Sequence, residues 1–209
     1  MDELIYIKIR MLEDVLHQQV LTIHRKGIFM NQKTKIITLI GLMTGVTCIL
    51  GPLSIPIPVS AVPITFTNLA IYLSAIILGQ KKATLSYLIY LLIGLVGVPV
   101  FSGFTGGPGK LLGPTGGYLI GFIFMTFITG FFVDKFPRKI HMYVMGMVLG
   151  IIVTYIFGTA WLAYQANMTF LAALFVGVVP YIVGDIIKII VATVIGIPIK
   201  KQIKRAGYL

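Results

Sequence analysis

Long apolar runs, separated by short turns in which basic residues gather, are the feature that most constrains the fold of this chain. Only 11% of the 209 residues are charged and 57% are hydrophobic, whereas about a quarter of the residues of a soluble domain are charged. None of the runs alternates with the period of two that a membrane β-barrel strand shows. The pattern therefore predicts an all-α membrane protein with six transmembrane helices in a lipid bilayer. The runs lie at about residues 36–51, 64–79, 83–98, 118–134, 140–164 and 170–199.

The basic residues predict how this bundle is oriented. Lys110 is the one basic residue in the loops 52–63, 99–117 and 165–169. Eleven others flank the opposite ends of the runs: Lys33, Lys35, Lys81, Lys82, Lys135, Arg138, Lys139, Lys200, Lys201, Lys204 and Arg205. Under the positive-inside rule this asymmetry predicts that both termini are cytoplasmic. The net charge of +11 does not indicate nucleic-acid binding, because no basic stripe is interleaved with aromatic residues.

The outward loop between the first two runs, residues 51–68, reads "GPLSIPIPVSAVPITFTN". Its four prolines exclude a helix and favour extended backbone. It is too apolar for a solvated loop, so we expect it to pack on the outer ends of the helices or to dip between them. It is either a structural cap or a lid over an outward-facing cavity.

The loop between the third and fourth runs, residues 98–121, contains seven glycines between Gly103 and Gly117. Glycine lets the backbone approach a ligand closely and present its N–H groups. The segment "GPTGGY" leads into the fourth run, whose first N–H groups have no intrahelical partner and can accept a carboxylate. The sequence therefore predicts long ordered outer loops between helices 1–2 and between helices 3–4.

Asp185 and Lys188 are the charged pair inside the last apolar run, and three residues of spacing put them on one helical face. Counted from Lys200, Asp185 lies about 22 Å up the helix, in the outer half of the membrane. Burying either charge is costly. Three interpretations remain open: a structural ion pair, a proton or ion relay, and a ligand site. Pro180 and Gly184 precede the pair and predict a kink that frees backbone groups there.

Several chemistries are excluded by what the sequence lacks. The segment "GFTGGPGKLLG" has Phe104 and Leu111 where a Walker A loop needs glycine and Ser or Thr. The single cysteine, Cys48, rules out a disulfide within the chain and a CxxC metal site. No His or Cys constellation suited to catalysis is present, so we expect neither an enzyme nor a metal site.

Residues 1–30 differ from the rest in being mixed in charge, and Met30 stands just before the first apolar run. They are either a leader, derived from an expression vector or an upstream start, or an amphipathic helix lying on the membrane surface. Residues 31–209 are predicted to form a single six-helix membrane domain.

Three ordered motifs carry a resemblance to a known family: "GPLSIPIPVSAVPITFTNLA", "VPVFSGFTGGPGKLLGPTGGYLIGF" and "VPYIVGDIIKIIVA". Together they resemble the biotin-specific substrate-capture (S) component of energy-coupling factor (ECF) transporters, the BioY family, from about residue 36 to 205. The resemblance implies a six-helix subunit of the cell membrane that binds biotin from outside with high affinity. It implies transport powered by a membrane coupling protein of the EcfT type and two ABC ATPase subunits. No cofactor is implied, since biotin is the transported ligand.

The resemblance also implies roles for particular residues. Gly41 and Gly45 in "IGLMTGV" have the spacing of small residues that dock the coupling protein, although the same spacing serves packing within a bundle. Asp185 would hold the ureido N–H groups and Lys188 the ureido oxygen, or Lys188 would instead pair with the carboxylate. The further ligand-binding candidates are Asn68, Gly106, Gly107, Thr115 and Tyr118 as polar contacts and Phe66, Phe101, Trp161 and Tyr181 as apolar walls.

The chief alternative is a stand-alone secondary transporter for a small vitamin-like solute, coupled to protons or sodium. Such folds usually carry inverted repeats, and residues 36–117 and 118–199 show no convincing self-similarity. A membrane enzyme is the third class, and one carboxylate with one lysine makes a poor catalytic set.

Overall fold

The computed structural model describes residues 10, 14, 18, 31–58 and 60–208. Its contacts divide the chain into residues 1–37 and 38–209, and the features below, apart from the start of α2, lie in the second unit. The predicted leader, residues 1–30, lies almost entirely outside the described residues and stays a prediction. The helices are α2 Gln32–Leu50, α3 Thr67–Leu78, α4 Gln80–Leu95, α5 Pro108–Leu112, α6 Gly116–Lys135, α7 Ile140–Gln165, α8 Phe170–Gly177 and α9 Ile182–Arg205.

Four segments of the described chain are long and apolar enough to cross a membrane: α2, α6, α7 and the run from α8 to the end of α9. The helices α3 and α4 have 12 and 16 residues, which span about 18 and 24 Å. The turn at Gly79, whose φ is 77°, lets α4 begin at once, three residues before the predicted run. Helices α3 and α4 therefore count as two of the six predicted spans only if the chain segments next to them complete the crossing.

The pair α6 and α7 forms the most closely packed part of the bundle because glycines let the two backbones approach. A side chain at Gly121 would lie 2.9 Å from the Thr154 Cα, and one at Gly150 would lie 2.9 Å from the Met125 Cγ. The core that α3, α4, α6 and α7 share is filled by fully buried Tyr72, Tyr90, Phe101, Met125 and Met147.

The proline-rich loop is a β-hairpin. Strand β1 (Ser54–Ile57) pairs antiparallel with β2 (Ser60–Thr65), with Ser54 opposite Thr65 and Ile57 opposite Ser60. The predicted extended backbone is confirmed. The chain is accordingly mostly helical, with one two-stranded hairpin in the loop where the prolines predict extended backbone.

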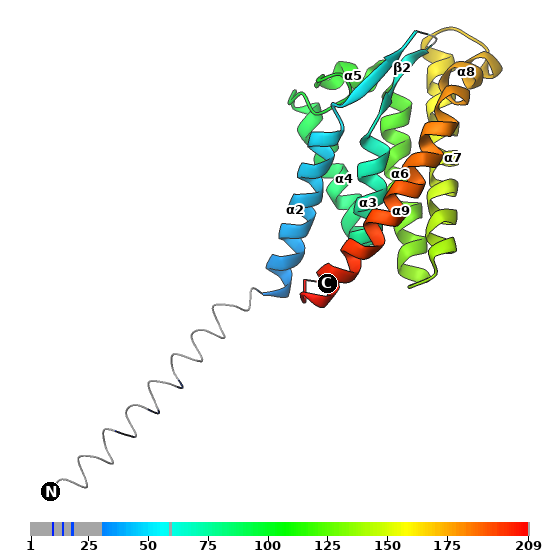
Figure 1. The fold of residues 1–209 in the computed structure, drawn as a ribbon. Coiled ribbons are helices and arrows are strands. Elements are labelled where there is room, and N and C mark those ends of the chain that lie inside the picture. The colour runs from blue at the N-terminus through cyan, green and yellow to red at the C-terminus, as the bar shows by residue number, and fades with distance from the viewer. Residues whose placement is uncertain (1–9, 11–13, 15–17, 19–30, 59, 209) are drawn as a thin grey trace, which may run out of the picture. The chain divides into compact units, whose positions relative to one another are not determined.

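The glycine-rich loop contains a helix that composition did not predict, the five-residue α5. The loop is fixed to the hairpin segment by a hydrogen bond from the Gly103 N–H to the Pro52 carbonyl oxygen, 3.0 Å. The Tyr90 hydroxyl also donates to the Val100 carbonyl oxygen, 3.0 Å away. Together the hairpin and residues 98–115 cover one end of the bundle, called the hairpin end below (Figure 1).

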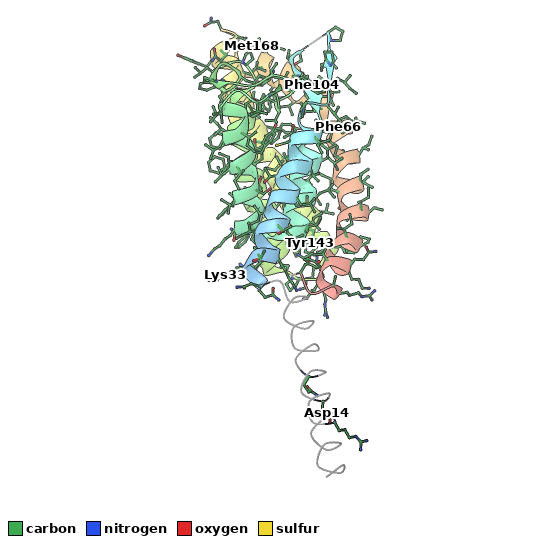
Figure 2. The ribbon with its side chains drawn as sticks, turned by 90° about the vertical axis from the view of Figure 1, so that its left-hand side faces the viewer. Asp14, Lys33, Phe66, Phe104, Tyr143 and Met168 are labelled. Carbon is green, nitrogen blue, oxygen red and sulfur yellow. The ribbon has the colours of Figure 1, made fainter. Side chains whose placement is uncertain are left out.

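The opposite end carries the turn at Gly79, residues 136–139 and the C-terminal part of α9 (Figure 1). There Asp134 of α6 accepts a hydrogen bond from the Gln80 N–H, 2.8 Å, which joins α6 to the start of α4. The Lys200 Nζ lies 5.8 Å from the ring centre of Tyr143, which joins α9 to α7. Figure 2 shows Phe104 and Met168 at the hairpin end and Tyr143 far from them.

The last apolar run is broken, as Pro180 predicts. The helix α8 ends at Gly177, a 3₁₀ turn η1 covers Val179–Tyr181, and α9 starts at Ile182. Gly184 lies inside α9. The break places Asp185 in the first turn of α9, where the free N–H groups of the helix favour a negative charge.

Candidate functional site

Asp185 and Lys188 form a buried ion pair in α9. The Lys188 Nζ lies 3.0 Å from the Asp185 Oδ1, and the two residues are 8% and 6% exposed. Because both charges are buried together, each lowers the cost of burying the other.

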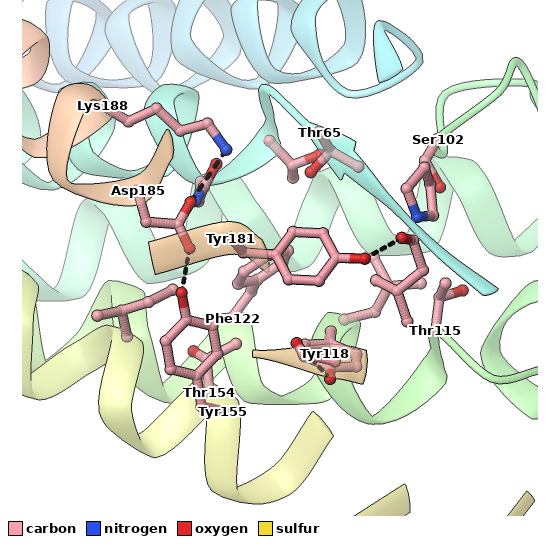
Figure 3. Close-up of a pocket in the computed structure, with 17 residues that line it drawn as sticks. Thr65, Ser102, Thr115, Tyr118, Phe122, Thr154, Tyr155, Tyr181, Asp185 and Lys188 are labelled. Carbon is pink, nitrogen blue, oxygen red and sulfur yellow. Dashed lines mark hydrogen bonds and ion pairs between the residues drawn. The ribbon is translucent and has the colours of Figure 1, made fainter. Parts of the chain in front are cut away.

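Two further side chains donate to the same carboxylate from other helices (Figure 3). The Asn68 Nδ2 of α3 lies 2.6 Å from Oδ1, and the Tyr155 hydroxyl of α7 donates to Oδ2. Asp185 therefore joins α3, α7 and α9 through three charge-assisted hydrogen bonds, which are stronger than hydrogen bonds between neutral groups.

The Asn68 side chain has one acceptor left over. Its Nδ2 donates to Asp185, which turns the carbonyl oxygen away from the carboxylate, and Oδ1 has no hydrogen-bond partner within the described structure. Buried polar atoms are usually paired. An unpaired carbonyl oxygen beside an ion pair is suited to accept an N–H from a ligand.

The pair lies at one end of a cavity with about 600 Å³ of open space, its mouth included. Figure 3 shows Asp185, Lys188 and Tyr155 at one end of this cavity and Ser102 and Thr115 at the other. The lining residues are Val62, Pro63, Thr65, Thr67, Asn68, Ser102, Thr115, Tyr118, Leu119, Phe122, Ile151, Thr154, Tyr155, Gly177, Tyr181, Asp185 and Lys188.

The hairpin forms one wall of the cavity through Val62, Pro63 and Thr65 of β2. The Tyr181 hydroxyl donates to the Val62 carbonyl oxygen, which ties the hairpin to the break before α9. The hairpin therefore covers the cavity, and this hydrogen bond is one of the contacts that hold it there.

Six of the predicted ligand residues line the cavity: Asp185, Lys188, Asn68, Thr115, Tyr118 and Tyr181. Tyr118 is held in place because its hydroxyl donates to the Gly177 carbonyl oxygen, 2.9 Å away. Tyr118 therefore lines the cavity while its hydroxyl group already has a hydrogen-bond partner.

The other five predicted residues are not among the lining residues: Phe66, Phe101, Gly106, Gly107 and Trp161. Phe66 precedes α3, and Phe101 packs edge-on against the Tyr90 ring with centres 5.6 Å apart. The Trp161 Nε1 donates to the Gly113 carbonyl oxygen, 2.8 Å away.

The two glycines are engaged within their own loop. The Gly107 N–H donates to the Gly94 carbonyl oxygen, 2.7 Å. A side chain at Gly106 would meet the backbone of Gly97 and Val98. The loop backbone at these glycines is therefore packed against the end of α4.

Tyr155 is the functional candidate that sequence reasoning missed, together with Ser102 and Thr154. Tyr155 lies in the middle of an apolar 26-residue helix, where an uncharged aromatic residue resembles a packing or lipid-facing residue. A search for hydroxyl-bearing side chains able to pair with a buried carboxylate could have identified Tyr155. Among the described residues, no three His, Cys, Asp or Glu side chains gather in a metal-binding group.

Comparisons with known proteins agree with one another. The sequence model described as "BioY family" matches residues 22–205. The chain is 37% identical over 178 residues to a biotin transporter BioY of Lactococcus lactis, covering 82% of this chain and 94% of that protein. It is 39% identical over 147 residues to the biotin transporter BioY of Thermotoga maritima, covering 70% of this chain and 86% of that protein.

A solved structure has the same fold. It is the S-component for biotin from an ECF-type ABC transporter, and it superposes with a TM-score of 0.78 at 36% identity. The match covers 84% of this chain and 95% of that chain. By its sequence and its fold, this membrane protein belongs to the BioY family.

Proposed function

We propose that the chain is the biotin-binding subunit of an ECF-type transporter, which captures biotin from outside the cell for ATP-driven import by separate subunits. The observation that carries this is the buried group of Asp185, Lys188, Asn68 and Tyr155 at the end of a cavity otherwise lined largely by apolar and hydroxyl side chains. The named relatives transport or bind biotin. No step in this role makes or breaks a covalent bond, so the chain is not an enzyme.

The polar group matches the hydrogen-bonding pattern of a ureido ring, which offers two N–H donors and one carbonyl acceptor. An ionised carboxylate accepts about four hydrogen bonds, and three positions on Asp185 are occupied. The remaining position and the Asn68 Oδ1 supply two acceptors for the two ureido N–H groups. Lys188 has three N–H donors, of which one is held by Asp185, so another can donate to the ureido oxygen.

The site residues therefore divide into two kinds. Asp185, Lys188 and Asn68 contact the ureido ring, and Tyr155 orients the carboxylate. Tyr118 and Tyr181 form walls for the bicycle, as do Phe122 and Ile151. The residues outside the lining, Phe66, Phe101, Gly106, Gly107 and Trp161, support the loops around the cavity in this proposal.

The proposal includes six spans with both termini in the cytoplasm. The helices α3 and α4 are short, and β2 continues the α3 segment along the cavity wall, where non-helical backbone is tolerated at membrane depth. Lys81, Lys82, Lys135 and Lys139 lie at the end opposite the hairpin, as the positive-inside rule requires of a cytoplasmic face.

The open face of α2 is the proposed docking surface for the coupling protein. A side chain added at Gly41 or Gly45 would meet nothing within 4 Å, so these glycines are not needed to pack α2 against this chain. Leu42 and Ile49 beside them are 59% and 70% exposed. Small residues on an open helix face let a partner helix approach closely, and the coupling protein would bring the two ABC ATPase subunits.

Vesicles containing the purified chain alone test this division of labour. The capture role predicts that such vesicles bind biotin and do not accumulate it under a proton or sodium gradient. Accumulation driven by either gradient would favour the stand-alone secondary transporter instead.

A further inference from the structure

The end of the bundle opposite the hairpin carries a group of lysines from two helices. Lys82 lies in the first turn of α4, and Lys200 and Lys204 lie near the end of α9. Lys200 is half-buried, and the charged groups close enough to act on its ammonium group are Asp134, Lys204 and Lys82. We call Lys82, Lys200 and Lys204 the lysine cluster. Its three positive charges lie near one another although Lys82 is far from the other two in the chain.

Negative charge is scarce around the lysine cluster. Asp134 and Asp185 carry the only side-chain carboxylates of residues 31–208, and Asp185 is paired with Lys188. Asp134 already accepts a hydrogen bond from the Gln80 N–H, 2.8 Å away. One engaged carboxylate therefore faces three ammonium groups, so the cluster keeps a positive charge that suits an anion.

Lys200 is held in place by the packing of α9. Gly196, one turn earlier, lies against α3, and a side chain added there would meet the Ile76 Cδ1 at 3.1 Å. Lys200 follows Gly196 on the same helical face, and its Nζ lies 5.8 Å from the ring centre of buried Tyr143 in α7. The aromatic ring stabilises the ammonium group and does not neutralise its charge. Lys200 is therefore a preorganised cation where α9 meets α3 and α7.

Apolar side chains form the surface next to the lysine cluster. On α9, Val194, Ile195 and Ile199 are 65%, 46% and 36% exposed, and on α4 Leu85 is 48% exposed. In a membrane protein, exposed apolar side chains on a spanning helix contact acyl chains, and lysines at the end of such a helix reach the headgroups. The cluster therefore lies where the apolar surface ends, at the level of the phospholipid headgroups.

We propose that the lysine cluster binds the phosphate of an anionic phospholipid whose acyl chains lie along α9 and α4. Lys200 is the fixed cation, and Lys82 and Lys204 add the charge that favours an anionic headgroup over a zwitterionic one. Basic pockets between membrane helices bind anionic headgroups in this way. An acidic protein surface would neutralise the lysines and leave the apolar surface beside them uncovered, whereas a phospholipid covers both. This inference does not depend on the capture of biotin.

Native mass spectrometry of the detergent-purified chain with phosphatidylglycerol and with phosphatidylcholine tests the site. We expect the parent to bind phosphatidylglycerol more tightly than phosphatidylcholine. Lys200→Met should weaken phosphatidylglycerol binding about fivefold, the effect expected of one lysine at an anionic lipid surface, and should leave phosphatidylcholine binding unchanged. Lys200→Arg should bind both lipids like the parent.

Two further variants keep the test decisive. Lys204→Met changes an exposed position and should weaken phosphatidylglycerol binding by a similar factor, so it replaces Lys200→Met if that variant does not fold. The matched control is Lys139→Met, which removes an exposed lysine of the α6–α7 turn at the same end of the bundle and should bind both lipids like the parent. Biotin affinity equal to the parent's shows that each variant is folded.

Three outcomes would overturn the lipid site. One is equal affinity of the parent for the two lipids, and equal weakening in Lys200→Met and Lys139→Met is another, because only the total charge would then matter. Displacement of phosphatidylglycerol by millimolar inorganic phosphate is the third, since the acyl chains would then contribute nothing. If Lys200→Met and Lys204→Met bind phosphatidylglycerol like the parent but no longer co-purify with the coupling protein, the cluster belongs to a protein interface and the lipid site is wrong.

Discussion

The Asn68 Nδ2 lies 2.6 Å from the Asp185 Oδ1, although the two residues are 117 positions apart in the chain. The contact joins α3 to α9 at the point where the last apolar run breaks. With Tyr155 and Lys188 it makes one carboxylate the meeting point of three helices. The binding chemistry and the packing of the bundle therefore depend on the same group.

Removing either charge of the buried pair should abolish tight binding. We expect Asp185→Asn and Lys188→Met each to weaken biotin binding about 100-fold, because each removes a charged partner of the ureido ring in the proposed site, and hydrogen bonds to charged groups contribute about 1.5–3 kcal/mol. Calorimetry measures the affinity, and thermal unfolding in detergent checks that each variant is folded. Biotin affinities equal to the parent's in both variants would contradict the site.

Tyr155 should act by positioning the carboxylate. Tyr155→Phe keeps the ring and removes the hydroxyl that donates to Asp185, so we expect a loss of about tenfold in biotin affinity, in the range measured for hydrogen bonds to charged groups. The matched control is Tyr164→Phe on the same helix, since Tyr164 is 76% exposed. Unchanged affinity in Tyr155→Phe would show that Asp185 does not need this donor.

The hairpin should act as a lid that Tyr181 holds closed. Tyr181→Phe removes the hydrogen bond to the Val62 carbonyl oxygen, and we expect the dissociation rate of biotin to rise about fivefold, as expected for one hydrogen bond of about 1 kcal/mol. Release of radiolabelled biotin into excess unlabelled biotin measures the rate. A dissociation rate equal to the parent's would mean that the hairpin is a fixed cap.

The docking surface on α2 can be separated from the binding site. Gly41→Leu places a side chain into open space, so biotin binding should be unchanged while co-purification with the coupling protein is lost. Ala160→Leu, at an exposed position on α7, is the control and should still co-purify. Retained co-purification in Gly41→Leu would place the docking surface elsewhere.

Sequence reasoning located the charged pair because charge within an apolar run is costly and therefore conspicuous. It also predicted the break at Pro180 and the extended backbone of residues 51–68, since proline acts locally on its own backbone. Tyr155 could not be found this way. Whether an aromatic residue of an apolar helix faces lipid, core or cavity depends on the rotation of that helix, which tertiary packing decides.

The same limit explains Phe101 and Trp161. Phe101 belongs to a conspicuous motif and Trp161 is the single tryptophan of the chain. Phe101 nevertheless packs on Tyr90, and Trp161 donates to the Gly113 carbonyl oxygen. The helix α5 was missed because its segment, "PGKLL", is too short and too rich in helix breakers for local propensity to indicate a helix.

Titration calorimetry of the purified chain with biotin, set against thiamine and riboflavin, tests the central claim most directly. The account predicts tight binding of biotin, with one site per chain, and no measurable binding of the other two vitamins. Absence of biotin binding by the folded chain, or equal binding of all three vitamins, would contradict it.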